Sequence, residues 1–259
     1  MSAQRGNGPA AEVGPGAEAV LITGGASGIG LTCALQAARR GARVAILDVD
    51  LTAAERAVGD LEGGGHLAIA VDVTDAAAMR EAVGRFADGR AITGVVAAAG
   101  IVSRAPLLTI TPEDFLRVLE VNVVGVQNTI SAAGPHLIQA GWSGSVVVLG
   151  SAAAFTGGGL MGNGAYATSK AALIGLVRGY ARELAPHGVR VNMVAPGATE
   201  TPMTAVLDSA DRDRIAAMSL LGRLSTPEEI ASAIAFLLAP AVGTLTGQVI
   251  HVNGGVVFG

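Results

Sequence analysis

Cysteine is almost absent from this sequence, which has Cys33 alone among 259 residues. A single thiol excludes any disulfide within the chain, so a reducing, cytoplasmic location is predicted. Charged residues are also few, at 15 %, and the formal net charge of −4 gives no electrostatic reason to expect nucleic acid as a partner. No apolar run is long enough to cross a bilayer, so no membrane association is predicted.

Apolar residues, in contrast, make up 51 % of the chain. That share argues against disorder and fits a parallel sheet covered on both faces, whose strands read as continuous apolar runs. The length suits one large α/β domain. Residues 1–17 are rich in Gly, Ala and Pro without any period, so a flexible leader is predicted there and the domain is expected over 18–259.

Short apolar runs alternate with helical patterns along the whole domain. Strands are predicted at Ala19–Thr23, Arg43–Asp48, Leu67–Val71, Thr93–Ala98, Ser145–Leu149, Val189–Val194 and Val249–Val252. Helices are predicted at Gly28–Arg40, Leu51–Leu61, Asp75–Ala87, Pro112–Gln139, Ala165–Ala185, Asp211–Ser219 and Pro227–Leu238. Strict alternation indicates βαβ units, and the leading topology is a single-domain, Rossmann-type doubly wound parallel sheet. An eight-fold barrel also alternates, but it is disfavoured because a glycine-rich loop directly follows the first strand.

That loop, with the sequence TGGASGIG at 23–30, joins the first strand to the first helix. Glycine lets the backbone approach a pyrophosphate closely, and the free N–H groups at the helix start then face that anion. Asp48 closes the second strand, where an acid can accept hydrogen bonds from the adenosine ribose and would repel a 2′-phosphate. No Arg or Lys stands nearby, so NAD(H) is favoured over NADP(H). A tight turn and a helix cap are the alternatives for the loop and for Asp48.

Tyr166 and Lys170 lie four residues apart at the start of a predicted helix, so their side chains share one face. A phenol has an unperturbed pKa of about 10, and a neighbouring ammonium favours the phenolate and lowers that pKa. The pair is therefore a candidate general acid/base for a carbonyl and its alcohol. By spacing alone, a solvated helix face is the commoner origin of such a pair.

Seven sequence features in register resemble the short-chain dehydrogenase/reductase family over about residues 19–255. They are TGGASGIG at 23–30, Asp48, Asp72-Val73, Asn122 in VNVVG, Ser151 in LGSAA, YATSK at 166–170 and PGATET at 196–201. The resemblance implies that a nicotinamide dinucleotide carries the hydride while the protein supplies orientation and a proton. It also implies a homotetramer, built through the helices that hold Asn122 and Tyr166 and through the last strand.

The resemblance further implies a role for each matching residue. Tyr166 would exchange a proton with the substrate oxygen, and Ser151 would hold and polarise that oxygen. Lys170 would bind the nicotinamide ribose and lower the tyrosine pKa, while Asn122 would position a water linking Lys170 to solvent. No metal is implied. Cofactor contacts are expected from Gly24, Ser27, Gly28, Ile29, Gly30, Asp48, Asp72, Val73, Gly100, Tyr166, Lys170, Pro196, Gly197, Thr199 and Thr201.

Two departures from the family pattern concern the predicted site. Ala97-Ala98-Ala99-Gly100 stands where the family usually has Asn-Ala-Ala-Gly, which puts the local ties between strands in question. Ser151 and Tyr166 are 15 positions apart, about two more than usual, so the pliant glycine-rich stretch 157–164 must bulge outward for Ser151 to face the site.

Substrate selection is expected in that stretch and between Thr199 and about Arg223, where the length suits a lid that orders over bound substrate. No cation there stands out as the partner of an anionic group, so an uncharged, mainly apolar alcohol or ketone is predicted. The candidate pocket residues are all apolar: Phe155, Leu160, Met161, Met203, Val206 and Leu207.

The leading function is the reversible oxidation of a secondary alcohol to a ketone, with NAD as the hydride acceptor. One alternative is a 3-oxoacyl-thioester reductase of the same fold. Asp48 argues against it, because such reductases often use NADPH. The other alternative is a non-catalytic, dinucleotide-binding sensor or scaffold. The presence of both Tyr166 and Lys170 argues against that class, and both alternatives stay open.

Overall fold

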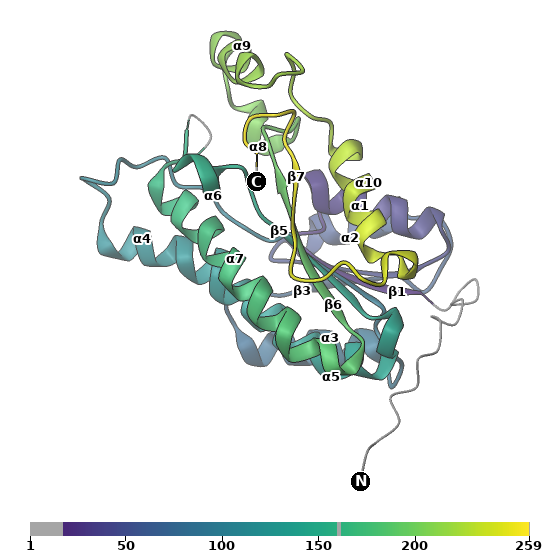
Figure 1. The fold of residues 1–259 in the computed structure, drawn as a ribbon. Coiled ribbons are helices and arrows are strands. Elements are labelled where there is room, and N and C mark those ends of the chain that lie inside the picture. The colour runs from purple at the N-terminus through teal and green to yellow at the C-terminus, as the bar shows by residue number, and fades with distance from the viewer. Residues whose placement is uncertain (1–17, 160–161, 259) are drawn as a thin grey trace.

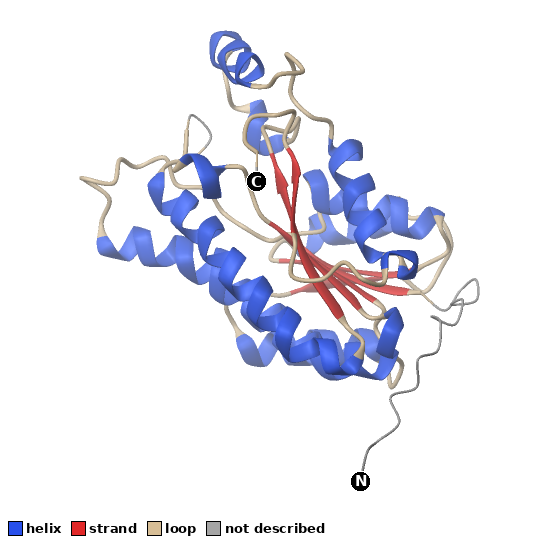
Figure 2. Ribbon diagram, viewed as in Figure 1, coloured by secondary structure: helices blue, strands red, loops and turns tan. Residues whose placement is uncertain are grey.

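The computed structural model describes residues 18–159 and 162–258, which fold around one seven-stranded sheet. The strand order is β3-β2-β1-β4-β5-β6-β7, and every neighbouring pair is parallel. Figure 2 shows helices on both sides of this sheet. The predicted single-domain, Rossmann-type doubly wound sheet is therefore confirmed, whereas the leader predicted at 1–17 lies outside the described residues.

The strands lie where the continuous apolar runs predict them. They are β1 (Ala19–Thr23), β2 (Arg43–Asp48), β3 (Leu67–Ala70), β4 (Gly94–Ala97), β5 (Ser145–Leu149), β6 (Arg190–Pro196) and β7 (Val249–Val252). β6 continues past the predicted end at Val194, because Ala195 and Pro196 pair with the last two residues of β7. The strand order reverses between β1 and β4, where an open α/β sheet leaves a crevice at the carboxyl ends of its strands.

Two sets of helices bury the two faces of the sheet in separate apolar cores. One face is covered by α1 (Gly28–Arg39), α2 (Leu51–Gly59) and α10 (Pro227–Leu238). The other face is covered by α3 (Ala76–Ala87), α5 (Gly125–Ala140) and α7 (Gly164–Leu184). Burial on both faces is the reason why the strands are apolar throughout rather than alternating. Cys33 lies in the first core, where burial raises the pKa of its thiol to about 12, so the thiol is unreactive.

Four further α-helices of the described residues lie toward the carboxyl ends of the strands. They are α4 (Pro112–Leu119), α6 (Ala153–Thr156), α8 (Pro202–Ala205) and α9 (Ser209–Met218). Figure 1 shows α6, α8 and α9 beyond the same end of the sheet. The sequence did not predict α6 and α8, because four residues are too few to establish a helical period.

The helix predicted over Pro112–Gln139 is not continuous, which corrects the sequence prediction. A π-helical turn at Glu120–Val124 separates α4 from α5. Asn122 sits in this turn, and its side chain is tied to the loop after β4, accepting from the N–H of Ile101 at 2.8 Å and donating to its carbonyl at 2.9 Å. A π turn adds one residue without interrupting the apolar pattern, so periodicity alone does not reveal it.

Arg190 holds the carboxyl end of α10 against the start of β6. Its buried guanidinium donates to the carbonyls of Leu237 at 2.7 Å, Leu238 at 3.2 Å and Ala239 at 3.0 Å. The last carbonyls of a helix have no partner within the helix. Arg190 gives Leu238 a donor and adds a second donor to Leu237, which also accepts from the Ser145 hydroxyl, and to Ala239, which also accepts from the N–H of Val242.

Arg190→Met is therefore expected to lower the free energy of unfolding by about 1–3 kcal/mol, because the carbonyl of Leu238 loses its donor and those of Leu237 and Ala239 each lose one of two. Urea unfolding followed by far-UV circular dichroism measures the change. Arg182→Met, at an exposed site near the end of α7, is the matched control and is expected to shift the midpoint little. Equal midpoints for the two variants would contradict this role of Arg190.

Candidate functional site

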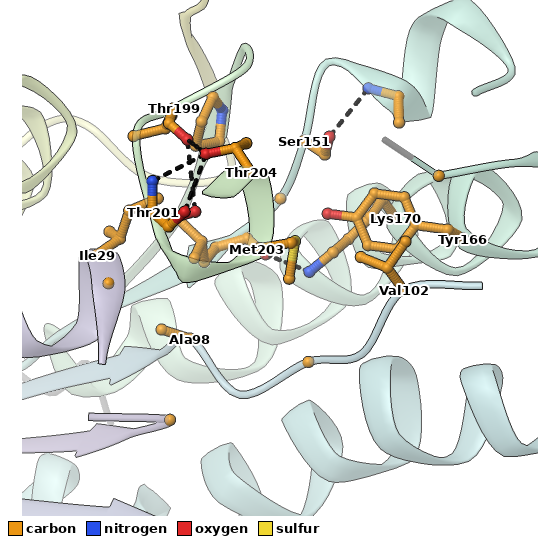
Figure 3. A pocket seen from close by; sticks show the side chains of 18 of the residues that line it. Ile29, Ala98, Val102, Ser151, Tyr166, Lys170, Thr199, Thr201, Met203 and Thr204 are labelled. Carbon is orange, nitrogen blue, oxygen red and sulfur yellow. Dashed lines mark hydrogen bonds between the residues drawn. The ribbon is translucent and has the colours of Figure 1, made fainter. Parts of the chain in front are cut away.

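A cavity of about 490 Å³ opens at the carboxyl ends of the strands. Its walls come from the loops that follow β1 to β6 and from the segment after β7. Figure 3 shows part of this lining, with Ile29, Ser151 and Tyr166 among the labelled residues. Every cofactor-contact candidate and three of the four catalytic candidates line this one cavity: Gly24, Ser27, Gly28, Ile29, Gly30, Asp48, Asp72, Val73, Gly100, Ser151, Tyr166, Lys170, Pro196, Gly197, Thr199 and Thr201. Asn122 does not line it, because its side chain is buried behind the cavity wall.

The glycine loop forms a cradle that side chains would fill. Gly24 has a φ of +64°, and a Cβ atom there would lie 2.7 Å from the Cα of Ala99. A Cβ atom on Gly30 would collide with the carbonyl oxygen of Gly24. Ser27 precedes α1 in an extended conformation without capping it, so the first N–H groups of the helix have no side-chain cap beside the cavity. Such an open helix start suits a pyrophosphate.

The first turn of α8 lies against this cradle. Thr204 donates to the carbonyl of Thr199 at 2.8 Å and accepts from the N–H of Thr201 at 3.0 Å (Figure 3). A Cβ atom on Gly28 would lie 3.4 Å from the methyl group of Thr201, so the two segments are in contact. α8 therefore places Thr201 beside the glycine loop and Met203 at the cavity.

Asp48 lies at the end of β2, next to the glycine loop. Its carboxylate accepts from the N–H of Ala26 at 3.2 Å and from the N–H of Asp50 at 3.3 Å. The cap of α2 is Asp50, which accepts from the N–H of Ala53 at 3.0 Å. The cap interpretation of Asp48 is therefore wrong, and its carboxylate lines the cavity.

Asp72 lines the same end of the cavity. One of its oxygens accepts from the N–H of Thr74 at 2.9 Å and from its hydroxyl at 2.8 Å, and the other lies 3.6 Å from the guanidinium of Arg117. The bonds from Thr74, together with Arg117, hold the pKa of this carboxyl below its ordinary value. Arg117, on α4, also lines the cavity and was missed in the sequence, since an arginine on an exposed helix face gives no pattern of its own.

Tyr166 and Lys170 stand in the first turns of α7, which Asn163 caps. The ammonium nitrogen of Lys170 donates to the carbonyl of Leu149 at 2.8 Å and lies 5.6 Å from the centre of the Tyr166 ring. Burial lowers the pKa of Lys170 to about 8. Figure 3 shows both side chains side by side at the cavity.

The pKa of Tyr166 is raised rather than lowered, which corrects the expected effect of Lys170. Burial raises this pKa, and a hydrogen bond with the Ser151 hydroxyl lowers it by less. Desolvation disfavours the phenolate more strongly than the hydrogen bond with Ser151 favours it. The tyrosine is consequently a proton donor at neutral pH before any ligand is bound.

The longer connection between Ser151 and Tyr166 does not displace Ser151 from the cavity. Its Oγ accepts from the N–H of Ala153 at 3.1 Å, at the start of α6. Gly159 and Gly162 exchange backbone hydrogen bonds of 2.8 and 3.2 Å and so form a small antiparallel bridge. A Cβ atom on Gly162 would lie 2.7 Å from the Tyr166 ring, so glycine is needed where this bridge packs on the tyrosine.

Ser169 connects Asn122 to the backbone of Tyr166, and sequence reasoning missed it. Its hydroxyl accepts from the amide of Asn122 at 2.9 Å and donates to the Tyr166 carbonyl at 2.7 Å. Asn122 and Ser169 are both fully buried. The π turn and α7 are therefore tied together directly beneath the tyrosine. A serine one place before the lysine carries no signal from spacing.

Ser169→Ala is expected to lower the free energy of unfolding by about 1–3 kcal/mol, because the buried amide of Asn122 loses a partner. Thermal unfolding checks this expectation. Thr168→Ala, its exposed neighbour on α7, is the control and is expected to be close to neutral. A Ser169→Ala protein as stable as the control would show that the tie contributes nothing.

The predicted pocket residues need correction. Met203 lines the cavity, whereas Phe155, Val206 and Leu207 do not. Phe155 packs on His251 with ring centres 4.7 Å apart, and Val206 follows α8 with 70 % of its surface exposed. The predictions for Leu160 and Met161 lie outside the described residues. The apolar residues that line the cavity without having been predicted include Val102, Ile215, Met218 and Val256.

Arg223 lines the cavity, but its charge is already matched. It donates to both carboxylate oxygens of Glu229, at 2.8 and 2.6 Å. The same contacts lower the pKa of Glu229 to about 2, so this partner stays ionised.

Within the ranges described, no three His, Cys, Asp or Glu side chains gather in a way that could hold a metal ion. No helix there is long and apolar enough to cross a membrane.

Comparisons with known proteins place the chain among oxidoreductases. The model of a family described as "Enoyl-(Acyl carrier protein) reductase" matches residues 24–257. The chain is 36 % identical to a (3R)-3-hydroxyacyl-CoA dehydrogenase of Canis lupus familiaris, over 91 % of this chain and 94 % of the relative. It is 38 % identical to a 3-oxoacyl-[acyl-carrier-protein] reductase of Thermotoga maritima, over 92 % and 96 % of the two chains.

Solved structures agree with these sequence matches. A short-chain dehydrogenase/reductase described as a glucose/ribitol dehydrogenase, from Brucella melitensis, superposes with a TM-score of 0.86 at 33 % identity, covering 93 % of this chain and 97 % of that one. A 3-oxoacyl-[acyl-carrier protein] reductase from the same organism gives a TM-score of 0.87 at 30 % identity, covering 100 % and 99 %.

Proposed function

This chain belongs to the short-chain dehydrogenase/reductase family of oxidoreductases, and from that premise we propose that it interconverts a secondary alcohol and a ketone with NAD(H). The observation that carries the proposal is a single cavity that is lined by a glycine cradle, by an acid at the end of β2 and by a tyrosine with a serine beside it. A nicotinamide dinucleotide supplies or accepts the hydride when it is bound.

The residues present fit such a cofactor. The glycine cradle and the open start of α1 would hold the pyrophosphate, and Asp48 the adenosine ribose. Asp72 and the backbone of Val73 would contact the adenine, and Lys170 the nicotinamide ribose. The nicotinamide end would lie against the segment after β6, through Pro196, Gly197, Thr199 and Thr201.

The protein's part in the reaction is to hold the substrate oxygen and move one proton. Ser151 donates a hydrogen bond to that oxygen, and the Tyr166 hydroxyl gives it a proton during reduction or takes one during oxidation. Burial raises the pKa of Tyr166, so reduction is favoured near neutral pH and oxidation becomes faster as the pH rises. Asn122 and Ser169 position the tyrosine from behind the cavity wall.

The preference for NAD(H) rests on Asp48 and is tested by comparing cofactors. The wild-type chain is expected to bind NADH at least about tenfold more tightly than NADPH, because the carboxylate would repel the 2′-phosphate. Asp48→Ala should remove most of this difference. Titration of NADH and NADPH fluorescence measures both dissociation constants.

Asp50→Ala is the matched control, since Asp50 is an acid two residues away that caps α2 and does not line the cavity. It should leave the NADH-to-NADPH ratio unchanged even if it costs stability. Tighter binding of NADPH than of NADH by the wild-type chain would rule out the proposed cofactor.

The proposal of an uncharged substrate is supported by the ion pairs that the arginines of the cavity already form. Arg117 faces Asp72 and Arg223 faces Glu229, so neither is left to bind an anionic group. Lys170 is the remaining cation of the cavity lining in the described part of the chain, and it donates to Leu149. An alcohol or ketone without a charge near the reacting carbon therefore suits the site best.

A second candidate substrate is a 3-oxoacyl thioester, which is itself a ketone. Relatives at 36–38 % identity carry names of enzymes that act on 3-hydroxyacyl-CoA and 3-oxoacyl carrier-protein substrates. Comparing the rate of NADH oxidation with acetoacetyl-CoA and with a panel of simple ketones distinguishes the two substrate classes. The third reading, a sensor or scaffold, fits less well because Ser151, Tyr166 and Lys170 all line the cavity.

The homotetramer and the cytoplasmic location stay proposals. The first rests on the resemblance and on small residues along α7, of which Ala172 and Gly175 are exposed in the single chain. The second rests on the lone, buried Cys33. Size-exclusion chromatography with light scattering tests the tetramer directly.

A further inference from the structure

The segment after β7 forms part of the cavity wall. Asn253 and Val256 both line the cavity, and Val256 is its most C-terminal lining residue. Sequence motifs of the site end well before this point, at Thr201. The residues after β7 therefore lie outside the motifs that are predicted to hold the cofactor and to move the proton.

A tight turn fixes the position of Val256. Asn253 is buried, and its side-chain oxygen accepts from the N–H of Gly255 at 2.9 Å and of Val256 at 3.1 Å, while its amide donates to the carbonyl of Val257 at 3.1 Å. Gly254 and Gly255 have φ values of +64° and +83°, which other residues rarely adopt. The turn is consequently held by both backbone conformation and side-chain hydrogen bonds.

The same turn anchors the end of segment 199–223, called the cover below, several residues of which line the cavity. The N–H of Leu220 and the hydroxyl of Ser219, just after α9, donate to the carbonyl of Gly254 at 2.8 and 3.2 Å. A Cβ atom on Gly255 would lie 2.7 Å from a methyl carbon of Leu220, so the two segments are closely packed. Ser219 also lines the cavity, which places the cover and the turn on one continuous wall.

This wall contacts the segments that follow β5 and β6. His251 of β7 packs against Phe155 of α6, the helix that directly follows Ser151. A Cβ atom on Gly197 would lie 2.9 Å from the carbonyl oxygen of Asn253. Figure 1 shows the C-terminal end of the chain next to α8, in the region of α6.

We propose that Val256 is a specificity-determining residue, whose side chain limits the size of the group that a substrate carries beside its reacting carbon. This inference rests on the proposed function, because it needs a substrate bound at Ser151 and Tyr166. A branched apolar side chain on a fixed turn gives a firm boundary, and a change of one or two methyl groups at such a boundary changes selectivity measurably.

The test uses the full-length chain, NADH and a series of methyl ketones of increasing bulk. Val256→Ala is expected to raise the ratio of kcat/KM for bulky against small ketones by about tenfold, and Val256→Phe to lower it by about the same factor. Val257→Ala is the matched control, since Val257 is the next residue, equally half-buried, and does not line the cavity. NADH affinity should stay within about twofold of wild type in all three variants.

The possible outcomes distinguish a failure of the role of Val256 from a failure of the proposed function. Unchanged ratios in both Val256 variants, or an equal shift in Val257→Ala, would overturn the role of Val256 while leaving the proposed function standing. If the wild-type chain bound NADH but reduced none of the ketones, the proposed function itself would fail, and the inference with it. A loss of NADH affinity in the Val256 variants would place this wall at the cofactor instead.

Discussion

Tyr166→Phe is expected to lower kcat by roughly 10²- to 10⁴-fold, the usual contribution of a general acid/base. The phenylalanine ring keeps the contact with Gly162 and the place beside Lys170, so the cavity should retain its shape. What is lost is the hydroxyl that interacts with Ser151 and would exchange a proton with the substrate oxygen. NADH affinity should change by less than about threefold, because a proton-transfer group acts mainly on the chemical step.

The control for this prediction is Tyr180→Phe. Tyr180 is the other tyrosine of the chain, and it also stands on α7, where its hydroxyl donates to the carbonyl of Gln127 at 3.3 Å. Removing that hydroxyl should leave kcat within about twofold of wild type, as expected away from the reacting atoms. Turnover that survived in Tyr166→Phe, with the fold intact, would sink the proposed proton transfer.

The pH dependence of the wild-type enzyme tests whether the pKa of Tyr166 is raised or lowered. Because burial raises the pKa of Tyr166, the protonated form that reduction needs persists well above neutral pH. The phenolate that oxidation needs increases only as the pH rises. Oxidation rates that were highest in mild acid would contradict this assignment.

The sequence predicted the parts of this protein that depend on local backbone rules. Continuous apolar runs located the buried strands, and glycines at 24 and 30 marked places where the chain approaches itself too closely for a side chain. The candidate cofactor-contact residues lie around one cavity because parallel strands all end at the same edge of the sheet. Residues placed directly after such strands can therefore be located from the sequence.

The missed features depend on contacts between distant segments. The hydrogen bond from the Asn122 amide to Ser169 joins residues 47 positions apart. The bond from the N–H of Leu220 to Gly254 joins the segment after α9 to the C-terminal turn. Val206 was expected in the pocket because it is apolar, but the short α8 directs it to solvent. The raised pKa of Tyr166 likewise follows from burial in the fold and not from its spacing to Lys170.

Lys170→Met is expected to lower kcat/KM by about 100-fold or more, because it removes the ammonium beside Tyr166 and the proposed contact with the nicotinamide ribose.

Lys170→Met should also change how the free energy of unfolding depends on pH in the protein without cofactor. Burial lowers the pKa of Lys170 to about 8, whereas the unfolded chain keeps a value of 10.5. Between these values the unfolded state binds more protons, so the contribution of Lys170 makes stability rise with pH in this window.

The size of this rise is at most about 3 kcal/mol, from the difference between the two pKa values. Lys170 is the sole lysine of the chain, so no other lysine titrates there. Cys33 acts in the opposite direction, since burial raises its folded pKa to about 12 from 9.0 and stability falls where only the unfolded thiol ionises. Subtracting the pH profile of Lys170→Met from that of the wild type removes the contribution of Cys33. Urea unfolding at pH 7, 8, 9 and 10 should then give a difference that increases with pH, and a flat difference would mean that Lys170 is not desolvated in the folded chain.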